Sequence, residues 1–168
     1  TIFDAKANTK EENMFSPTAV SFKRPSIALS SIDIGGNETY TISNGIFVLN
    51  DTIVLQENAT LIVENAELRF NMSSRTIIQA NDNSTVIILN SVVSHLLGYA
   101  YIDSYDIAHS FIDSSFLRRI YVYFYENSTA VMEDSIFTYG LYLYEYSELM
   151  FLGSIANDLG AYGNSVLS

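Results

Sequence analysis

The sequence predicts an all-β solenoid, in which a short unit of strand and turn recurs along the chain and stacks on the unit before it. Three observations predict this fold. The apolar residues are mainly Ile, Val, Leu, Phe and Tyr, which suit a pleated, half-buried surface. A short segment recurs six times at a nearly regular interval. Two bursts of alternating tyrosines, one from Tyr121 and one from Tyr142, are separated by a similar interval.

The composition indicates one folded domain. A chain of 168 residues is long enough for one hydrophobic core, and 48% hydrophobic content argues against disorder despite a net charge of −11. The absence of cysteine excludes disulfides and thiolate metal sites. The most apolar window, Val86 to Ile102, is interrupted by asparagine, serine and histidine, so no membrane span is predicted.

Positive charge is concentrated near the N-terminus. Residues 1–24 have a net charge of +1 and residues 25–168 a net charge of −12. The four basic residues of the first segment are Lys6, Lys10, Lys23 and Arg24. So acidic a body excludes nucleic acid as a partner, and it leaves cations, basic protein segments and neutral glycans as candidates.

The repeat aligns six segments without gaps. They are NETYTISNGIF from Asn37, NATLIVENAEL from Asn58, NSTVIILNSVV from Asn83, DIAHSFIDSSF from Asp106, NSTAVMEDSIF from Asn127 and YSELMFLGSIA from Tyr146. Strands that recur at this interval, with turns at the same point each time, indicate stacked turns of a solenoid.

The columns of this alignment predict which side chains enter the core. The fourth and sixth columns are mostly apolar and share one strand face. The fourth column is Tyr40, Leu61, Val86, His109, Ala130 and Leu149, and the sixth is Ile42, Val63, Ile88, Phe111, Met132 and Phe151. The eighth column holds Asn44, Asn65, Asn90, Asp113, Asp134 and Gly153. A small residue follows each of these positions, which predicts a tight corner with left-handed backbone, where stacked asparagines hydrogen-bond from turn to turn.

This repeat resembles that of the right-handed parallel β-helix superfamily, the pectin-lyase-like fold, which has an internal asparagine ladder and turns of similar length. The resemblance covers residues 37–160 and implies a right-handed parallel β-helix of about six turns. It concerns architecture and carries little information on function. The acidic, cysteine-free and sequon-rich composition is also loosely similar to that of secreted archaeal envelope, sheath and surface-layer proteins.

The two ends of the chain lie outside the repeat. Residues 1–36 contain both prolines, and form either a cap on the solenoid or an extended arm that packs on a neighbouring subunit. Residues 161–168 are expected to form a C-terminal tail. The chain opens on Thr1 rather than Met, as expected of a processed N-terminus. A separate alternative is that the chain is a fragment of a longer β-helix, with residue 168 an artificial end.

The tyrosine bursts lie on the second strand of each turn. Stacking of successive turns in the predicted register places the tyrosines in three files along the solenoid. These are Tyr99–Tyr121–Tyr142, Tyr101–Tyr123–Tyr144 and Asp103–Tyr125–Tyr146. Smaller residues of opposite parity fill the core better than phenols, whose hydroxyls need partners, so the tyrosines are predicted to point outward. Such a strip is either an inert β-surface or an interface, and its size favours an interface.

No catalytic residue is predicted. The resemblance implies that hydrolases of the fold need paired carboxylates, and that its lyases need a base beside calcium, but the chain has no Asp-Asp pair. Structural roles are expected for Asp103, Asp106, His95, His109, Asp113, Arg118 and Arg119. No cofactor is expected, and calcium at turns such as QANDNST stays an open alternative, so the metal site is unknown.

Six sequons for N-glycosylation occur. Their asparagines are Asn37, Asn50, Asn58, Asn71, Asn83 and Asn127. Four of the six open a repeat, where Asn-Ser-Thr is also a common turn sequence. Glycosylation of a surface protein and turn chemistry alone explain them equally well.

The expected function is that of a secreted or cell-surface structural protein without enzymatic activity. Its subunits would assemble into a filament, tube, sheath or surface layer through the tyrosine strip and the basic N-terminal segment. The alternative is a glycan-binding adhesin module or a carbohydrate-active enzyme, in which aromatic rows stack on sugar rings. The absence of tryptophan and of a carboxylate pair argues against this alternative.

Overall fold

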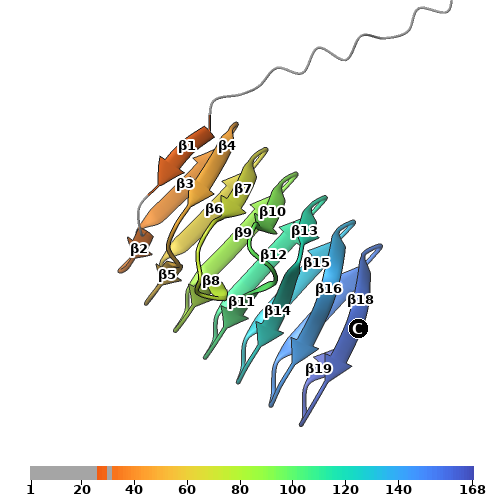
Figure 1. Cartoon of the computed structure of the whole chain (residues 1–168). Helices are drawn as coiled ribbons and strands as arrows, with labels where there is room; N and C mark the ends of the chain where they lie inside the picture. Colours follow the sequence, from red (N-terminus) through yellow and green to blue (C-terminus); the bar gives the residue numbers. More distant parts are fainter. Residues whose placement is uncertain (1–25, 30–31) are drawn as a thin grey trace, which may run out of the picture.

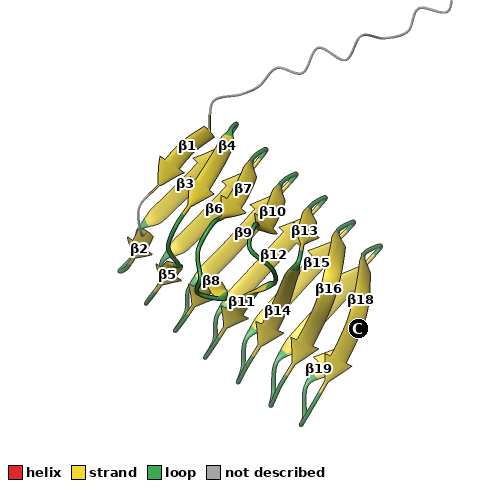
Figure 2. Cartoon of the chain, in the orientation of Figure 1, coloured by secondary structure: helices red, strands yellow, loops and turns green. Residues whose placement is uncertain are grey.

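Parallel strands stack in register along one axis to form the whole described molecule (Figure 1). The computed structural model describes residues 26–29 and 32–168. These residues form nineteen strands, joined by turns and loops (Figure 2). The fold is an all-β parallel solenoid of about seven turns. In this part of the chain no helix is long and apolar enough to cross a membrane.

Each complete turn contributes to three columns of parallel strands. The first column is β1 (Ser26–Leu29), β4 (Ile46–Leu49), β7 (Glu67–Phe70), β10 (Val92–His95), β13 (Phe116–Arg118), β16 (Ile136–Leu143) and β18 (Ile155–Ala161). The second is β2 (Ile32–Ile34), β5 (Ile53–Leu55), β8 (Thr76–Ala80), β11 (Ala100–Ser104) and β14 (Ile120–Phe124), continued by the later residues of β16 and β18. The third is β3 (Thr39–Ser43), β6 (Thr60–Glu64), β9 (Thr85–Leu89), β12 (His109–Asp113), β15 (Thr129–Glu133), β17 (Glu148–Leu152) and β19 (Val166–Leu167).

The solenoid has about seven turns instead of the six predicted. Strands β1 and β2 lie within residues 1–36, and they pair in parallel with β4 and β5. They complete the first turn together with β3. The solenoid therefore includes residues that the repeat alone places in the cap.

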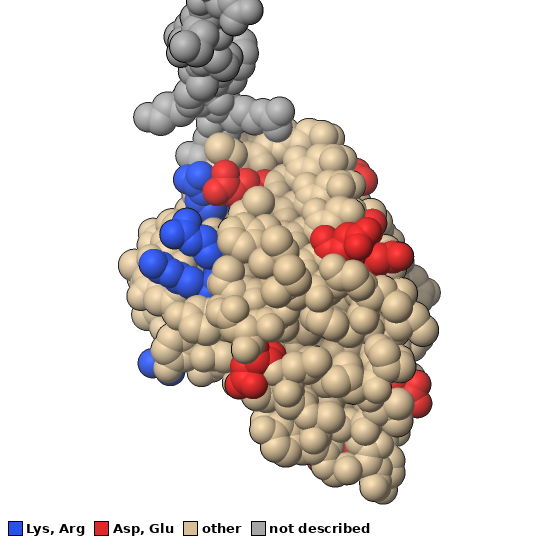
Figure 3. Space-filling view, turned by 90° about the vertical axis from the view of Figure 1, so that its right-hand side faces the viewer, with Lys and Arg blue, Asp and Glu red and all other residues tan. Residues whose placement is uncertain are grey.

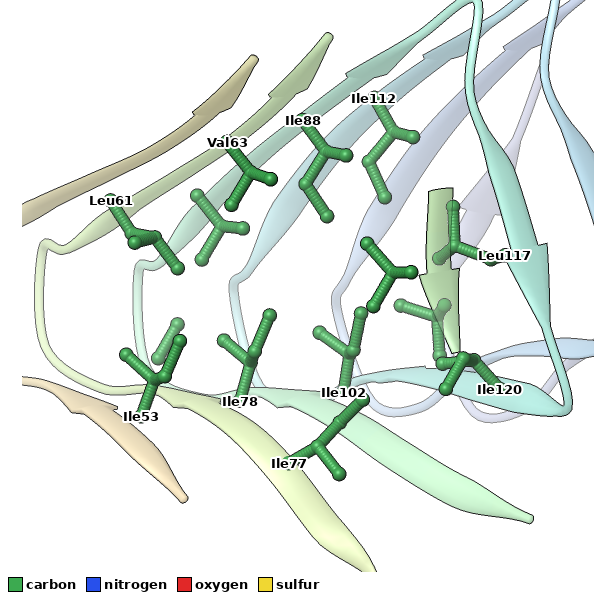
Figure 4. Close-up of a cluster of buried hydrophobic side chains, with 14 of the residues drawn as sticks. Ile53, Leu61, Val63, Ile77, Ile78, Ile88, Ile102, Ile112, Leu117 and Ile120 are labelled. Atoms are coloured by element: carbon green, nitrogen blue, oxygen red, sulfur yellow. The ribbon is translucent and has the colours of Figure 1, made fainter. Parts of the chain in front are cut away.

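The core consists of vertical files of apolar side chains. Val63 pairs with Ile88, which pairs with Ile112, and all three are buried (Figure 4). Ile53, Ile78 and Ile102 form a second file across the interior, on the second column of strands. Because alternate strand residues point inward, each turn adds one layer to each file. The predicted continuity of Val63, Ile88 and Met132 is confirmed.

The predicted alignment is wrong by one residue in its fourth repeat. Ser110 and Ile112 point inward, whereas His109 is exposed and Phe111 is half-buried. The turn residue equivalent to Asn83 and Asn127 is Ile107, as its backbone hydrogen bond to the previous turn shows. Asparagine marks this position in four of the other five repeats but is absent here, so the predicted alignment begins one residue too early, at Asp106.

One corner of the solenoid, between the third and the first column, combines left-handed backbone with a serine ladder. The positive φ angles fall at Asn44, Asn65, Asn90, Ser114, Asp134 and Gly153. In the next position, the backbone N–H of one turn donates to a serine hydroxyl of the following turn. The hydroxyls belong to Ser91, Ser115, Ser135 and Ser154, at 2.9 to 3.2 Å. The ladder recorded at this corner is therefore made by serine, not by the expected asparagines.

A second corner, between the second and the third column, carries a file of carboxylates on left-handed backbone. It consists of Glu57, Asp82, Asp106, Glu126 and Glu145, one per turn. The backbone N–H of Glu57 donates to Asp82 (2.9 Å), and that of Asp82 donates to Asp106 (3.2 Å). Beside this file Asn58 donates to Asn37 and Asn83 donates to Asn58, so amides do form a ladder, but on the surface.

The third corner, between the first and the second column, becomes shorter in the later turns. Three residues, 50–52, separate β4 from β5, five, 71–75, separate β7 from β8, and four, 96–99, separate β10 from β11. Arg119 alone separates β13 from β14, and β16 and β18 continue through this corner. The later turns therefore present a nearly uninterrupted sheet surface, and most of the tyrosines lie there.

Candidate functional site: a tyrosine face

Ten of the twelve tyrosines form one contiguous cluster, which we call the tyrosine face. Its members are Tyr99, Tyr101, Tyr105, Tyr121, Tyr123, Tyr125, Tyr139, Tyr142, Tyr144 and Tyr162. They lie on or next to β11, β14, β16 and β18. Period-two alternation places their rings outward, whereas Ile120, Val122 and Phe124 of β14 are buried. The predicted outward orientation is therefore observed.

The predicted register of the tyrosine files is wrong by two residues. Tyr101 opposes Tyr121, Asp103 opposes Tyr123, and Tyr123 opposes Tyr142. In each pair the partner from the earlier turn lies two positions further along its strand than predicted. A shift of two residues keeps every side chain on the same strand face, which is why the orientation was predicted correctly although the partners were not.

The set of predicted interface tyrosines also changes. Tyr105, Tyr139 and Tyr162 join the face, and Tyr146 does not. Tyr146 is a turn residue with 61% of its surface exposed, and it occupies the position of Asn127 one turn on. Glu145, which has the parity of the inward-pointing residues, instead takes a left-handed turn conformation in the carboxylate file.

The rings of the face stack on one another. In the file Tyr105–Tyr125–Tyr144–Tyr162 successive centroids lie 4.8, 5.2 and 5.1 Å apart, with interplanar angles of 6°, 11° and 15°. Tyr123 and Tyr142 stack similarly, at 5.2 Å and 17°. These spacings match the roughly 4.8 Å between neighbouring strands. In these stacked pairs a neighbouring ring covers a ring face, and the ring edges remain for solvent or a partner.

Two glycines make room for this arrangement. A Cβ on Gly140 would lie 2.7 Å from the ring of Tyr142. A Cβ on Gly160 would lie 2.8 Å from the ring of Tyr162 and 2.9 Å from that of Tyr142. Since these contacts are closer than carbon atoms approach without displacement, glycine at both positions allows the rings to lie flat against the strands.

Polar groups hold the margins of the face. The Arg75 guanidinium lies 4.2 Å from the centroid of the Tyr99 ring, in a cation–π arrangement, and also donates to the Tyr99 hydroxyl. On the opposite side the Tyr142 hydroxyl donates to Asp158 at 2.5 Å. Beneath the rings Asp103 is only 7% exposed and accepts a hydrogen bond from Thr76 at 3.0 Å.

These surroundings shift the pKa values of several groups. Burial raises the pKa of Tyr123 to about 12, with smaller contributions from neighbouring phenols and Asp103. Burial, then the Asp103 charge, raises the pKa of Tyr125. The hydrogen bond to Asp158 is the main cause of the raised pKa of Tyr142. Burial also raises the pKa of Asp103, against the effect of its Thr76 hydrogen bond. These three phenols are therefore neutral at physiological pH.

The residues considered for catalysis are not brought together. His109 is exposed and its Nδ1 lies 2.6 Å from the Thr129 hydroxyl, whereas Asp113 lies at the other end of β12 and accepts from the Ser114 hydroxyl. His95 is buried against the Met72 carbonyl oxygen, 3.1 Å from its Nε2, and lines a cavity of about 220 Å³ next to Tyr99. Among residues 26–29 and 32–168, no group of three or more His, Asp or Glu side chains is placed to hold a metal ion.

The basic side chains of the described residues gather on one part of the surface. In Figure 3 they lie along one edge, where an acidic group lies beside them, and the other visible acidic groups lie elsewhere on the surface. The basic residues of the described chain are Arg69, Arg75, Arg118 and Arg119. Arg69 pairs with Glu67 at 2.7 Å, and Arg118 and Arg119 are exposed. Lys6, Lys10, Lys23 and Arg24 lie outside the described residues.

The six sequon asparagines are all exposed, including Asn50 and Asn71 in loops between the first and second columns.

Comparison of the chain with protein-family models, with curated proteins and with solved structures finds no match.

Proposed function

We propose that this chain is a structural subunit of the cell exterior, which self-associates through the tyrosine face into a filament, tube, sheath or surface layer. The single observation that supports this most is the contiguity of the face. Ten phenols contact one another across four turns of the solenoid. Isolated surface tyrosines are common, but a continuous aromatic surface of this extent is typical of a protein–protein interface.

The stacking also lowers the cost of association. A tyrosine side chain offers a large contact area for the loss of only two side-chain torsions. Here the rings already hold one another in place, so little conformational entropy remains to be lost on binding. The neutral phenols add hydroxyl groups that donate and accept hydrogen bonds across an interface.

The same geometry weighs against sugar stacking. A pyranose ring packs against the open face of an aromatic ring. In the file from Tyr105 to Tyr162, however, each ring covers the face of the next, with interplanar angles of 15° or less. Ring edges and hydroxyls suit a second protein surface better than the flat side of a glycan. Self-association is therefore preferred over the glycan-binding alternative.

The basic N-terminal segment is the second element of the proposal. The carboxylate file from Glu57 to Glu145 offers one acidic group per turn at a single corner. Its charge is complementary to Lys6, Lys10, Lys23 and Arg24. In the assembly, residues 1–24 of one subunit would dock on this corner of a neighbour.

A location at the cell surface and a relationship to pectin-lyase-like β-helices are also part of the proposal. Exposure of all six sequon asparagines is compatible with glycosylation outside the cell. The parallel β-solenoid supports a relationship to the pectin-lyase-like β-helices, and the loose similarity to archaeal envelope proteins is compositional only.

Electron microscopy and sedimentation of the purified chain test the proposal. We expect ordered polymers at neutral pH. Replacing Tyr101, Tyr123 and Tyr144 together by threonine, which keeps strand propensity, should abolish them while circular dichroism still reports β-structure. The matched control replaces the exposed tyrosines outside the face, Tyr40 and Tyr146, and should still polymerise. Dispersed monomers of the unaltered chain, or normal polymers of the triple variant, would reject the tyrosine face as an interface.

Removal of residues 1–24 tests the arm separately. The shortened chain should remain folded but assemble poorly, and polymers of the full chain should weaken with added salt, because exposed charges are screened. A shortened chain that polymerises as well as the full chain rejects the arm and leaves the tyrosine face unaffected.

A further inference from the structure

Tyrosine is the side chain of this protein most open to one-electron oxidation. The chain contains no cysteine and no tryptophan, the two residues that otherwise compete for such oxidants. Ten tyrosines are in ring-to-ring contact, and the rings of β14 and β16 are half-buried rather than enclosed. One-electron oxidants that reach this surface therefore react first with tyrosine phenols.

Tyr142 has what phenol oxidation needs at neutral pH, a positioned proton acceptor. A phenol gives up an electron readily only if its proton leaves at the same time. The Tyr142 hydroxyl donates to Asp158 Oδ2 at 2.5 Å. The other oxygen of this carboxylate, Oδ1, accepts the backbone N–H of Leu159 at 2.9 Å, which holds the carboxylate in place. Of the hydrogen bonds recorded for the described residues, this is the one that joins a phenol of the face to a carboxylate.

The ring of Tyr123 is the immediate partner. Tyr123 and Tyr142 occupy directly opposed positions on the neighbouring strands β14 and β16. Their centroids lie 5.2 Å apart with an angle of 17° between the rings. Tyr123 in turn contacts Tyr101 and Tyr125, at 5.4 and 6.0 Å, so an electron vacancy can move among neighbouring rings before it is captured.

We infer that Tyr142 and Tyr123 form an oxidative cross-linking site, at which a peroxidase-class oxidant and hydrogen peroxide join the two rings as dityrosine. The link would tie β14 to β16 in a chain that has no cysteine for a disulfide. It forms within one chain and does not depend on assembly of the subunits.

The chemistry balances as follows. Each phenol loses one electron to the oxidant and its hydroxyl proton to a base, which for Tyr142 is Asp158. The two tyrosyl radicals form one carbon–carbon bond between their Cε atoms, next to the oxygens. Each ring then loses its Cε hydrogen as a proton and its oxygen regains one, so both phenols are restored. Two electrons and two protons leave in total, and they reduce one hydrogen peroxide to two water molecules.

The test uses the full chain, diluted until sedimentation shows monomers, and treated with a peroxidase and hydrogen peroxide. Monomers are then isolated under denaturing conditions and digested after Arg, Lys and Glu. The site predicts a cross-linked pair of peptides, Ile120–Glu126 with 134–145, that has lost two hydrogen atoms. Fragmentation should assign the bond to Tyr123 and Tyr142.

Four variants distinguish this site from random coupling. Tyr123→Phe and Tyr142→Phe each keep the ring but should each eliminate the Tyr123–Tyr142 link, whereas Tyr40→Phe should leave its yield unchanged. Asp158→Asn keeps the shape of the acceptor without its basicity, and should slow formation of the link at least about tenfold. If monomers of the unaltered chain lack the Tyr123–Tyr142 link, or carry a bond between other tyrosines instead, the proposed site is wrong. An unchanged rate in Asp158→Asn would overturn the role of Asp158.

Discussion

The backbone N–H of Ser91 donates to the hydroxyl of Ser115 in the next turn, at 3.1 Å. The same hydroxyl donates to the carbonyl oxygen of Asp113 at 2.7 Å, so one buried side chain connects two backbone groups at a corner of the solenoid. Corners lack the regular ladder of the sheets, and their buried N–H groups need other partners. The serine ladder provides these partners from Ala66 to Ser135.

Replacement of Ser115 by alanine should therefore destabilise the fold more than its size suggests. The Ser91 N–H would lose its acceptor while remaining buried, which costs about 1–3 kcal/mol. Urea unfolding followed by circular dichroism measures the change. Ser73→Ala, at an exposed loop position, is the control and should change the free energy of unfolding by less than about 0.5 kcal/mol. Equal effects of the two substitutions would show that the ladder does not stabilise the corner.

The core files predict a large difference between two adjacent isoleucines. Ile88 is fully buried between Val63 and Ile112, whereas Ile87 points outward and is half-buried. Ile88→Ala should reduce the free energy of unfolding by about 2–5 kcal/mol, because it leaves a cavity in the file. Ile87→Ala should cost about 1 kcal/mol at most, the range of strand preferences at a surface position. A greater loss of stability for Ile87→Ala than for Ile88→Ala would contradict the assignment of Ile88 to the buried face of β9.

The stack of strands was predictable because two local signals agree. Alternation at Leu61, Val63, Val86 and Ile88 indicates strands with one buried face, and the Asn-plus-small-residue corners set their ends. The fourth repeat was misaligned because its turn residue is Ile107, which has none of the usual turn chemistry. Serine in place of asparagine at the inner ladder was not predicted, because either side chain can satisfy a corner N–H.

The register of the tyrosine face depends on loop lengths that the residue pattern does not reveal. Tyrosines at every second position stack on one another in any register that is shifted by an even number of residues. The residue pattern is therefore consistent with several registers between neighbouring strands. The shrinking of the third corner, from residues 71–75 to Arg119 and then to none, selects the actual one. Tyr139 was missed for the same reason, because β16 continues through the corner where earlier turns have a loop.

Raised phenol pKa values predict a loss of stability at alkaline pH. Burial raises the pKa of Tyr123 to about 12 in the folded chain, against an ordinary value of 10.0. Between these values the unfolded chain releases this proton and the folded chain keeps it, so stability falls as pH rises from about 10 towards 12. Thermal unfolding measured across this range should show a decline that is smaller in Tyr123→Phe. An identical pH dependence in the variant would show that the Tyr123 phenol is not perturbed.

The carboxylate file predicts a gain of stability on mild acidification. The pKa of Glu126 is raised chiefly by its hydrogen bond with Asp106, then by burial and by the charges of Asp106 and Glu145. The folded chain therefore binds this proton at a higher pH than the unfolded chain does, and stability rises as pH falls through the folded pKa. Glu126→Gln, which is neutral at all pH values, should unfold at a higher temperature than the unaltered chain at pH 7 and show a smaller gain on acidification. Glu148→Gln, at an exposed position at the start of β17, is the control and should leave both quantities nearly unchanged. A Glu126→Gln variant that is less stable at pH 7 would mean that the carboxylates of this corner do not repel one another.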